Sequence, residues 1–528
     1  MNNKLLLSGI AFLTISFSGY CQTFYQKIYG DVSTNKAFSV ISLTNGDFVI
    51  SGQTGSTSAT KDVFLMRTDS LGNMVWTKSY GTAQSEEGRV CKQTPDGGFI
   101  ISGYSSSTNV DAALIKTDAN GVLQWSKKYG GTGNDFAWPL DITNTGEIYF
   151  AGWSSSTIYG GLFDAFIVKT NNTGDTLWTK MFGSASEDYF RGLAATSDGG
   201  CIAVGETNGW SSNYDVIVVK LNSSGVTMWT KILGTVADVD YAWTVKQTSD
   251  GGYIIGGNSG VNSAKGDVLL IKLDASGNIE WSKMIGDGNV ALNTCRSIIQ
   301  TSNGNYLMSG YTGIGGGNEE GLLMMLDNIG NTIWSKQYAV GDSIEHIRFI
   351  NEVTPNKYIA VGYTKDLVSA VGDYDVYFLQ INNNGFSGGC NESTITYSNS
   401  THTLPTISGA PSSSTNFTTS IISGSTTLVY SQNNLCDSTL FTTINENNFV
   451  ESEYFRVYPN PATEELTLEF FKNHIYSGQI KIFNSIGELF REISIASSIE
   501  INIADLPNGL YFIQLDSYPQ QTIKFIKQ

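Results

Sequence analysis

The chain has 528 residues, a net charge of −17, only 15% charged residues and 57 glycines. This length accommodates roughly two to four domains, and abundant glycine with few charges is typical of an all-β protein with many turns. The negative charge repels phosphate backbones, which excludes nucleic acid as a partner.

Residues 1–21 have the pattern of a secretory signal peptide. A positive charge precedes an apolar stretch over residues 5–17, which is too short to cross a bilayer. Gly19 and Cys21 are small residues that place a cleavage site before Gln22. A lipoprotein signal is the alternative, and it is disfavoured because a tyrosine precedes the cysteine. No other stretch reaches membrane-spanning length, so we expect no transmembrane segment.

Residues 22–389 repeat one unit that is marked by a tryptophan every 49 to 53 residues. The repeated tryptophans are Trp76, Trp125, Trp178, Trp229, Trp281 and Trp334. Each period contains four strand-like pieces, which in one period lie at 242–249, 253–257, 267–274 and 279–286. Four antiparallel strands in a repeat of this length are the signature of a β-propeller blade.

The repeat count indicates how the ring closes. Two different glycine turns each occur seven times, whereas a Trp strand follows the second turn only six times. Residues 23–30 supply the missing strand, with Tyr25 in the Trp position and Gly30 five residues later. Since closure removes exposed sheet edges, the sequence predicts an all-β fold with a seven-bladed β-propeller closed by the N-terminal strand.

The turn before each Trp strand carries a short motif, seen in Asp118, Gly121 and Trp125. It resembles the tryptophan-docking repeat of quinoprotein-type propellers and the Asp-box of sialidases, although the spacing differs from each by about one residue. The resemblance implies propeller architecture and implies neither quinone chemistry nor sialic acid hydrolysis. We expect the Asp or Asn to bond the hairpin backbone and the Trp to pack between blades.

Two recurring positions are candidates for a binding site. The first is acidic or amide in every repeat and is predicted at one mouth of the central channel, as Asn35, Glu86, Asp135, Asp188, Asp240, Asn293 and Glu345. These side chains either cap loops or form a polar ring for a cation or polar ligand. Three residues later come Phe38, Arg89, Trp138, Arg191, Trp243, Arg296 and Arg348, whose arginines we expect to pair with the acids and tie neighbouring blades.

The second position ends the second strand of each repeat and varies in chemistry. It holds Gln53, Tyr104, Trp153, Glu206, Asn258, Tyr311 and Tyr363. These residues either pack between blades or form a surface that binds glycan or peptide, because flat aromatic rings give rigid contact area at low entropic cost.

The sequence contains no motif of a known catalytic machinery. It has no nucleophile elbow, no phosphate-binding glycine loop and no zinc-site spacing among its three histidines. We therefore predict no catalytic residue, no metal and no cofactor. An enzymatic pocket, if present, is expected in the most irregular loops, at 154–163, 207–214 and 312–320.

Residues 390–449 are rich in Ser, Thr and Asn and predict either a linker or a small β module. Cys390 and Cys436 bracket this segment and are predicted to form a disulfide in an exported protein. The remaining mature cysteines, Cys91, Cys201 and Cys295, lie at strand positions where a thiol is a small core residue.

Residues 450–528 predict a small β-sandwich, since strands such as 466–470 alternate apolar and polar residues. This region resembles the type A C-terminal sorting domain of the type IX secretion system of Bacteroidetes over about the last 75 residues. The matching residues are Tyr458, Pro459, Asn460, Pro461, Gly487, Pro507, Asn508, Gly509, Tyr511, Lys524 and Lys527. The resemblance implies export through the periplasm and across the outer membrane by the type IX machinery, followed by release or surface attachment.

These patterns predict a secreted or cell-surface protein that binds without catalysis, with a glycan, a peptide or a surface protein as its partner. One alternative is an extracellular propeller hydrolase or lyase that acts on polysaccharide. Another is a structural surface component with no ligand. Fold alone does not separate these functions.

Overall fold

A computed structural model describes residues 24–437 and 455–527, except for short segments inside these ranges. The excepted residues are 32, 56–60, 107, 157–161, 210–212, 236, 263–264, 287–291, 315–317, 341–343, 366–373, 389–390, 396, 402–405, 409–411, 415–417, 422–425, 428–430, 459–461, 471–477, 485–488, 496–498, 507–508 and 516–517. The chain forms two compact units, with Thr23–Asp437 in one and Ser438–Gln528 in the other. The described residues are all-β, and none of them forms a helix with the length and apolarity that a membrane crossing requires.

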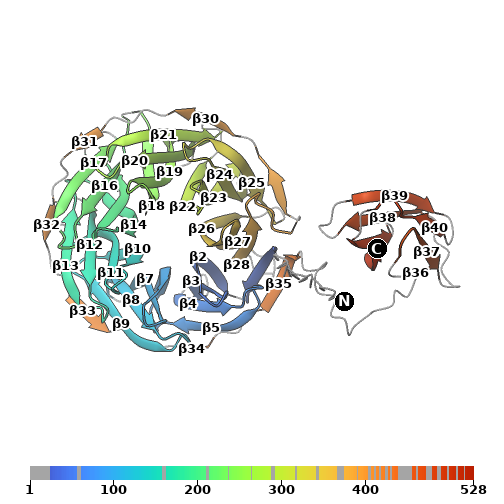
Figure 1. Cartoon of the computed structure of the whole chain (residues 1–528). Coiled ribbons are helices and arrows are strands. Elements are labelled where there is room, and N and C mark those ends of the chain that lie inside the picture. Colours follow the sequence, from blue (N-terminus) through green and yellow to red (C-terminus); the bar gives the residue numbers. More distant parts are fainter. Residues whose placement is uncertain are drawn as a thin grey trace, which may run out of the picture. The chain divides into compact units, whose positions relative to one another are not determined.

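The first unit consists of seven five-stranded antiparallel sheets, which Figure 1 shows side by side in a propeller-like ring. From the centre outward, sheet 1 contains β2 (Thr34–Ser42), β3 (Phe48–Gly55), β4 (Lys61–Thr68), β5 (Met74–Tyr80) and β34 (Thr426–Thr427). Sheet 2 contains β6 (Glu86–Gln93), β7 (Phe99–Ser106), β8 (Val110–Thr117), β9 (Leu123–Gly130) and β33 (Thr418–Ile421). Sheet 3 contains β10 (Asp135–Ile142), β11 (Ile148–Ser154), β12 (Asp164–Thr170), β13 (Thr176–Phe182) and β32 (Ser412–Ser414). Sheet 4 contains β14 (Asp188–Ala195), β15 (Cys201–Thr207), β16 (Asp215–Leu221), β17 (Thr227–Leu233) and β31 (Thr406–Ser408); sheet 5 contains β18 (Val239–Gln247), β19 (Tyr253–Asn262), β20 (Lys265–Leu273), β21 (Ile279–Gly286) and β30 (Ser398–Thr401); sheet 6 contains β22 (Asn293–Gln300), β23 (Tyr306–Ile314), β24 (Asn318–Leu326), β25 (Thr332–Tyr338) and β29 (Glu392–Thr394); sheet 7 contains β26 (Glu345–Thr354), β27 (Lys357–Lys365), β28 (Tyr374–Asn382), β1 (Tyr25–Gly30) and β35 (Ser431–Asp437).

The strand predicted to complete the ring is β1. It occupies the fourth position of sheet 7, where it pairs with β28 from Tyr25↔Gln380 to Tyr29↔Val376. The first strand of the unit in chain order, β1, is thereby paired with β28, the last strand before residues 392–437. Buried residues of both sheets, including Tyr29, Phe48 and Phe378, share one core cluster between sheet 7 and sheet 1.

Residues 392–437, which we name the belt, form the outermost strand of every sheet. The belt strands β29 to β35 pair with sheets 6, 5, 4, 3, 2, 1 and 7 in that order, so the chain returns around the rim of the ring (Figure 1). This differs from the predicted linker or separate module at 390–449, and it moves the end of the ring domain from residue 389 to residue 437. Strands of two to seven residues pair here through the backbone with the fourth strand of each sheet, which covers its open edge.

Neighbouring sheets are joined by a repeated contact, which we name the latch, between an aromatic residue of one sheet and a turn glycine of the next. At Gly174, whose φ is +78°, an added Cβ atom would lie 2.7 Å from the Trp125 ring, so only glycine fits. Tyr129 donates a 2.6 Å hydrogen bond to the carbonyl oxygen of the same glycine. The seven latches are Tyr25–Gly72, Trp76–Gly121, Trp125–Gly174, Trp178–Gly225, Trp229–Gly277, Trp281–Gly330 and Trp334–Gly385.

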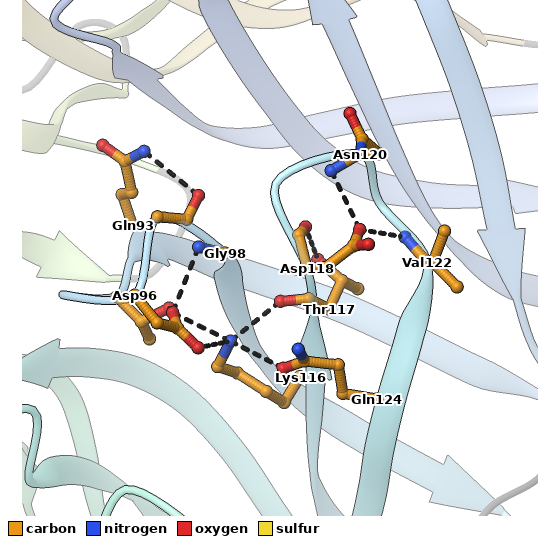
Figure 2. A network of polar contacts seen from close by, with 11 residues as sticks. Gln93, Asp96, Gly98, Lys116, Thr117, Asp118, Asn120, Val122 and Gln124 are labelled. Carbon is orange, nitrogen blue, oxygen red and sulfur yellow. Dashed lines mark hydrogen bonds and ion pairs between the residues drawn. The ribbon is translucent and has the colours of Figure 1, made fainter.

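Polar side chains hold the turns within each sheet, and Figure 2 shows them in sheet 2. Asp118 accepts hydrogen bonds from the backbone nitrogens of Asn120 at 2.8 Å and Val122 at 2.7 Å, as the turn motif predicts. The buried Lys116 donates from Nζ to both carboxylate oxygens of Asp96, at 3.1 and 2.9 Å. Side chains of each hairpin thus hold its own turn in place. The residue types on the innermost strands are therefore not fixed by the turns.

The second unit contains two antiparallel sheets. One holds β36 (Phe455–Tyr458), β37 (Glu465–Phe470) and β40 (Ile499–Asn502), and the other holds β38 (Gly478–Asn484), β39 (Leu489–Ile495), β41 (Gly509–Leu515) and β42 (Tyr518–Lys527). Leu466 and Leu468 from the first sheet share a core with Ile480, Ile482 and Ile513 from the second. The alternation of buried and outward residues along β37 is the pattern expected for a small sandwich.

Candidate functional site

The first unit encloses a cavity of about 110 Å³ that is lined by residues of the innermost strands. At its level each sheet contributes one half-buried residue, and we name this set the inner ring: Phe38, Arg89, Trp138, Arg191, Trp243, Arg296 and Arg348. These are the residues noted three positions after each predicted polar residue. The structure brings together seven side chains that are far apart in the sequence.

A β-bulge positions each inner-ring residue. In sheet 4, Phe190 pairs with Gly205 and Gly192 pairs with Val204, so Arg191 has no partner in the register. The same register shift occurs at the inner-ring residue of every sheet. A bulge re-aims the extra side chain, here toward the cavity. A Cβ atom at Gly205 would meet the backbone oxygen of Tyr189 at 1.8 Å, so the bulge requires glycine on the second strand.

Arginine and aromatic residues alternate around most of the inner ring. The Arg89 guanidinium carbon lies 4.4 Å from the ring centre of Phe38 and 4.1 Å from that of Trp138. Arg191 lies 4.7 Å from Trp138, and Arg296 lies 3.6 Å from the ring centre of Trp243. Such cation–π contacts link most neighbouring sheets across the cavity wall.

The second predicted position lies directly behind the inner ring. Trp153, Tyr311 and Tyr363 are only 8%, 5% and 6% exposed, and Glu206, Asn258 and Gln53 are also buried. Arg191 donates to Glu206 at 2.7 and 2.9 Å, and Trp243 donates to Asn258 at 2.8 Å. Of this set Tyr104 is half-buried and donates to Glu87 at 2.7 Å. These residues hold the inner ring in place, which corresponds to the packing alternative rather than to an exposed binding surface.

The arginines do not pair with the predicted polar ring. Arg89 forms an ion pair with Glu87, and Arg191 forms one with Glu206, each within its own sheet. The expectation that they tie neighbouring blades by ion pairs is therefore wrong, because the acids of the polar ring point to loops. The cation–π contacts described above connect the sheets instead.

The seven polar-ring residues are buried and lie outside the cavity lining: Asn35, Glu86, Asp135, Asp188, Asp240, Asn293 and Glu345. Asp188 accepts hydrogen bonds from the backbone nitrogen and the Oγ of Ser184, at 2.7 and 2.9 Å. Asp135 accepts from the backbone nitrogen of Gly131 at 2.8 Å. These are the contacts of loop caps. Burial raises the pKa of Asp135, Asp188 and Asp240 to about 6.

A hydrogen-bonded chain at the edge of the inner ring breaks the seven-fold pattern. His346 Nε2 contacts the Glu319 carboxylate, and Tyr363 donates to Nδ1 at 2.6 Å. The Tyr311 ring stacks on the imidazole at 3.8 Å. Burial lowers the pKa of His346 to about 4, so the imidazole is neutral at pH 7. His346 belongs to no recurring motif in the sequence, and its place directly after Glu345 of the predicted polar ring is the one signal that marks it. Glu319 lies in one of the loops predicted for an enzymatic pocket.

Other predicted residues are placed as follows. Cys91, Cys201 and Cys295 are buried free thiols. Tyr458 is exposed, Tyr511 and Lys527 are buried, and Gly509 and Lys524 lie in β41 and β42. The signal peptide at 1–21, Pro459, Asn460, Pro461, Gly487, Pro507, Asn508 and Cys390 fall outside the described residues. The Cys390–Cys436 disulfide stays a prediction. Among the residues that the structure describes, no three His, Cys, Asp or Glu side chains gather as metal ligands.

Several solved structures resemble the chain at low identity. A protein of unknown function from Dyadobacter fermentans DSM 18053 has 11% identity and a TM-score of 0.37, covering 69% of this chain and 98% of its own. An α-L-arabinanase from Penicillium chrysogenum, complexed with arabinobiose, has 11% identity and a TM-score of 0.41 over 68% and 98%. An α-L-arabinofuranosidase of Fusarium graminearum has 10% identity and a TM-score of 0.39 over 68% and 98%. At these scores the likeness carries no argument about ligand or chemistry.

No curated protein matches the chain in sequence. Residues 456–528 match the family model of the secretion system C-terminal sorting domain. The predicted sorting domain is thereby confirmed, with its start six residues later than predicted. The C-terminal region is a sorting domain of the type IX secretion system, which implies contact with that machinery and export to the cell surface or beyond.

Proposed function

We propose that the chain is a secreted or cell-surface binding protein whose ligand enters the central cavity of a seven-bladed β-propeller closed by β1. One observation carries this proposal. The latches repeat one chemistry around the ring, whereas the inner ring presents four arginines and three aromatic residues to a single cavity. Two of these arginines, Arg296 and Arg348, form no ion pair among the described residues. Cations gathered in one cavity repel one another, so stability alone gives no reason for these two.

The export route supports an extracellular partner. We propose that residues 1–21 are removed as a signal peptide and that the sorting domain then directs the folded ring to the surface. A glycan, a peptide or a surface protein is the partner class that meets a cavity in this location. Binding without catalysis fits the inner ring, because guanidinium groups and indole rings hold ligands but do not act as general bases at neutral pH.

The full-length chain without its signal peptide tests this function on arrays of glycans and peptides. We expect binding to a limited set of ligands and its loss in Trp138→Ala and Trp243→Ala. Far-ultraviolet circular dichroism and melting curves establish that both variants remain folded. An array with no bound ligand contradicts the proposal and favours the structural surface component.

The chain Glu319–His346–Tyr363 favours a second candidate, a hydrolase or lyase that acts on extracellular polysaccharide. A neutral imidazole held between a carboxylate and a phenol is the arrangement that general acid–base catalysis uses. Turnover of array hits, measured by release of reducing ends, decides between the two functions. Product formation that is lost in His346→Gln, with binding retained, would replace the non-enzymatic function by the enzymatic one.

A further inference from the structure

Two inner-ring arginines on neighbouring sheets lack a carboxylate partner among the described residues. Arg296 donates one hydrogen bond, from Nη2 to the phenol oxygen of Tyr311 at 2.9 Å. Arg348 has no hydrogen bond or ion pair within the described part of the chain, and its guanidinium carbon lies 5.8 Å from the ring centre of Phe38 and 5.5 Å from that of Tyr363. Since a guanidinium has five N–H donors in a planar fork, this pair retains the capacity to bind an anionic group.

The other inner-ring arginines differ in this respect. Glu87 neutralises Arg89, and Glu206 neutralises Arg191. No carboxylate lies within ion-pairing distance of Arg296 or Arg348 among the described residues, where the position behind the ring carries Tyr311 and Tyr363. The charge of Glu319, on sheet 6, acts on both arginines only at longer range. Arg296 and Arg348 are thus the two inner-ring arginines without an ion pair among the described residues, beside a cavity that Lys92 and Lys246 also line.

Lys36 of sheet 1 lies near Arg348 but outside the cavity lining. Its Nζ lies 3.7 Å from the ring centre of Tyr374 and 4.8 Å from that of Tyr363. Burial and then the charge of Arg348 and of Lys61 lower the pKa of Lys36 to about 8. Lys36 and Arg348 both lie against the Tyr363 ring, at 4.8 and 5.5 Å from its centre, and like charges at this separation repel each other.

On the opposite side of the inner ring, Trp138 and Trp243 flank Arg191. Trp138 lies 5.0 Å from Trp153 and 6.5 Å from Trp243 between ring centres, and its plane is within 23° of that of Trp243. Flat indole faces stack on the apolar faces of ring-shaped ligands. Peptide ligands are instead held by a free sheet edge or by separate side-chain pockets, and the cavity wall at this level consists of ring faces and guanidinium planes.

We propose that the cavity recognises a glycan built with uronic acids, whose carboxylate binds Arg296 and Arg348 while a sugar ring packs against Trp138 and Trp243 where they line the cavity. This inference rests on the proposed function of the cavity and names its ligand class. Arginine suits carboxylate because its fork donates two parallel hydrogen bonds. The net charge of −17 repels long polyanions at a distance, so short acidic oligosaccharides are the appropriate probes.

Calorimetry of the full-length chain without its signal peptide tests this ligand class. The probes are oligosaccharides of galacturonate, glucuronate and alginate, each beside its methyl-esterified, uncharged counterpart. We expect at least one acidic probe to bind, its ester to bind about tenfold more weakly or worse, and the affinity to fall with added salt. We expect Arg348→Gln to weaken the binding of the acidic probe by the same factor of about ten. Arg67→Gln is the control and leaves the affinity unchanged, because Arg67 pairs with Asp47 outside the cavity lining.

The outcomes separate this inference from the function beneath it. Esters that bind as tightly as acids, or acidic peptides such as hexaglutamate that bind in place of glycans, overturn the uronic acid inference and leave a binding cavity. Absence of binding to all probes and to the glycan and peptide arrays overturns both. If Arg348→Gln fails to fold, Arg348→Lys keeps the charge and loses the fork, and an unchanged affinity in that folded variant and in Arg296→Lys overturns the assigned contact.

Discussion

The latches between sheets repeat one chemistry, whereas the inner ring changes from sheet to sheet. Six latches place Trp on a turn glycine and the seventh places Tyr25 there. The inner ring holds Phe, Trp or Arg at one equivalent position. The difference follows from geometry, because a latch residue fills a fixed gap against backbone, while a bulge residue has no cross-strand partner. The fold therefore fixes the backbone around the cavity and leaves the cavity chemistry free to vary.

Removal of residues 23–30 is the largest perturbation that tests this comparison. The deletion takes away β1, its pairing with both β28 and β35, and the seventh latch. We expect the truncated chain to lose cooperative unfolding, because sheet 7 then has an exposed edge and the core loses Tyr25 and Tyr29. Thermal melts followed by circular dichroism measure this. A chain starting at Gln22 is the control, and equal melting temperatures would show that β1 does not stabilise the ring.

Two glycines with equal backbone strain isolate the packing part of a latch. Gly97 has a φ of +81° and nothing within 4 Å of an added Cβ atom, whereas the Cβ atom of Gly174 would lie 2.7 Å from Trp125 at a φ of +78°. We expect Gly97→Ala to cost about 1 kcal/mol of unfolding free energy and Gly174→Ala to cost about 2–4 kcal/mol. Urea titrations provide both values. Equal costs would mean that the Trp moves aside freely.

The part of the fold that depends on repeated side chains could be predicted from the sequence. The Trp spacing, the turn glycines and Tyr25 in the Trp position indicated the repeat and the strand that joins its two ends. The belt could not be predicted in this way. Its strands are short, rich in Ser and Thr, and pair only through their backbone, so they carry no alternating pattern that distinguishes them from a linker.

The candidate site could be predicted only in part. Arg191 and Glu206 were both identified as recurring positions, but the bulge that brings them together is not visible in the periodicity of a strand. The repeat pattern predicts that Asp188 and Glu206 share a channel mouth, whereas Asp188 caps its own loop and Glu206 accepts from Arg191. The recurrent glycine before the second position, such as Gly205, is the sequence signal that marks the bulge.

The aspartates that cap loops make the unfolding free energy of the first unit depend on pH. This effect is smaller than those expected for the deletion of β1 and for Gly174→Ala. Asp188 has a pKa of about 6 in the folded protein because it is buried, against about 3.9 unfolded. The folded state binds more protons between these values, so this contribution to stability is complete below pH 4 and is lost as the pH rises through 6. Asp135 and Asp240 act in the same direction, and His346, with a pKa of about 4, acts in the opposite one.

Asp188→Asn removes one of these titrations. We expect the fall in unfolding free energy between pH 5 and pH 7.5 to shrink by about 1–2 kcal/mol, measured by urea titration at each pH. Asp175→Asn is the matched control, because this exposed carboxyl has a pKa of about 2, owing to hydrogen bonds from Lys127, Thr173 and Asn171, and does not titrate in this range. An unchanged pH profile in Asp188→Asn would show that this carboxyl stays charged when buried.

The smallest effect on stability is expected in the inner ring itself. Arg348→Gln gives up the contacts with Phe38 and Tyr363 but also removes a like charge beside Arg296 and Lys36. These changes oppose each other, so we expect the unfolding free energy to shift by about 0.5 kcal/mol or less. Arg191→Gln is the contrasting variant. It leaves Glu206, which is 2% exposed, without its cation, and a buried carboxylate that loses its partner is costly. Urea titration of the two variants therefore separates an arginine held for structure from one left available to a ligand, and equal costs would remove that distinction within the ring.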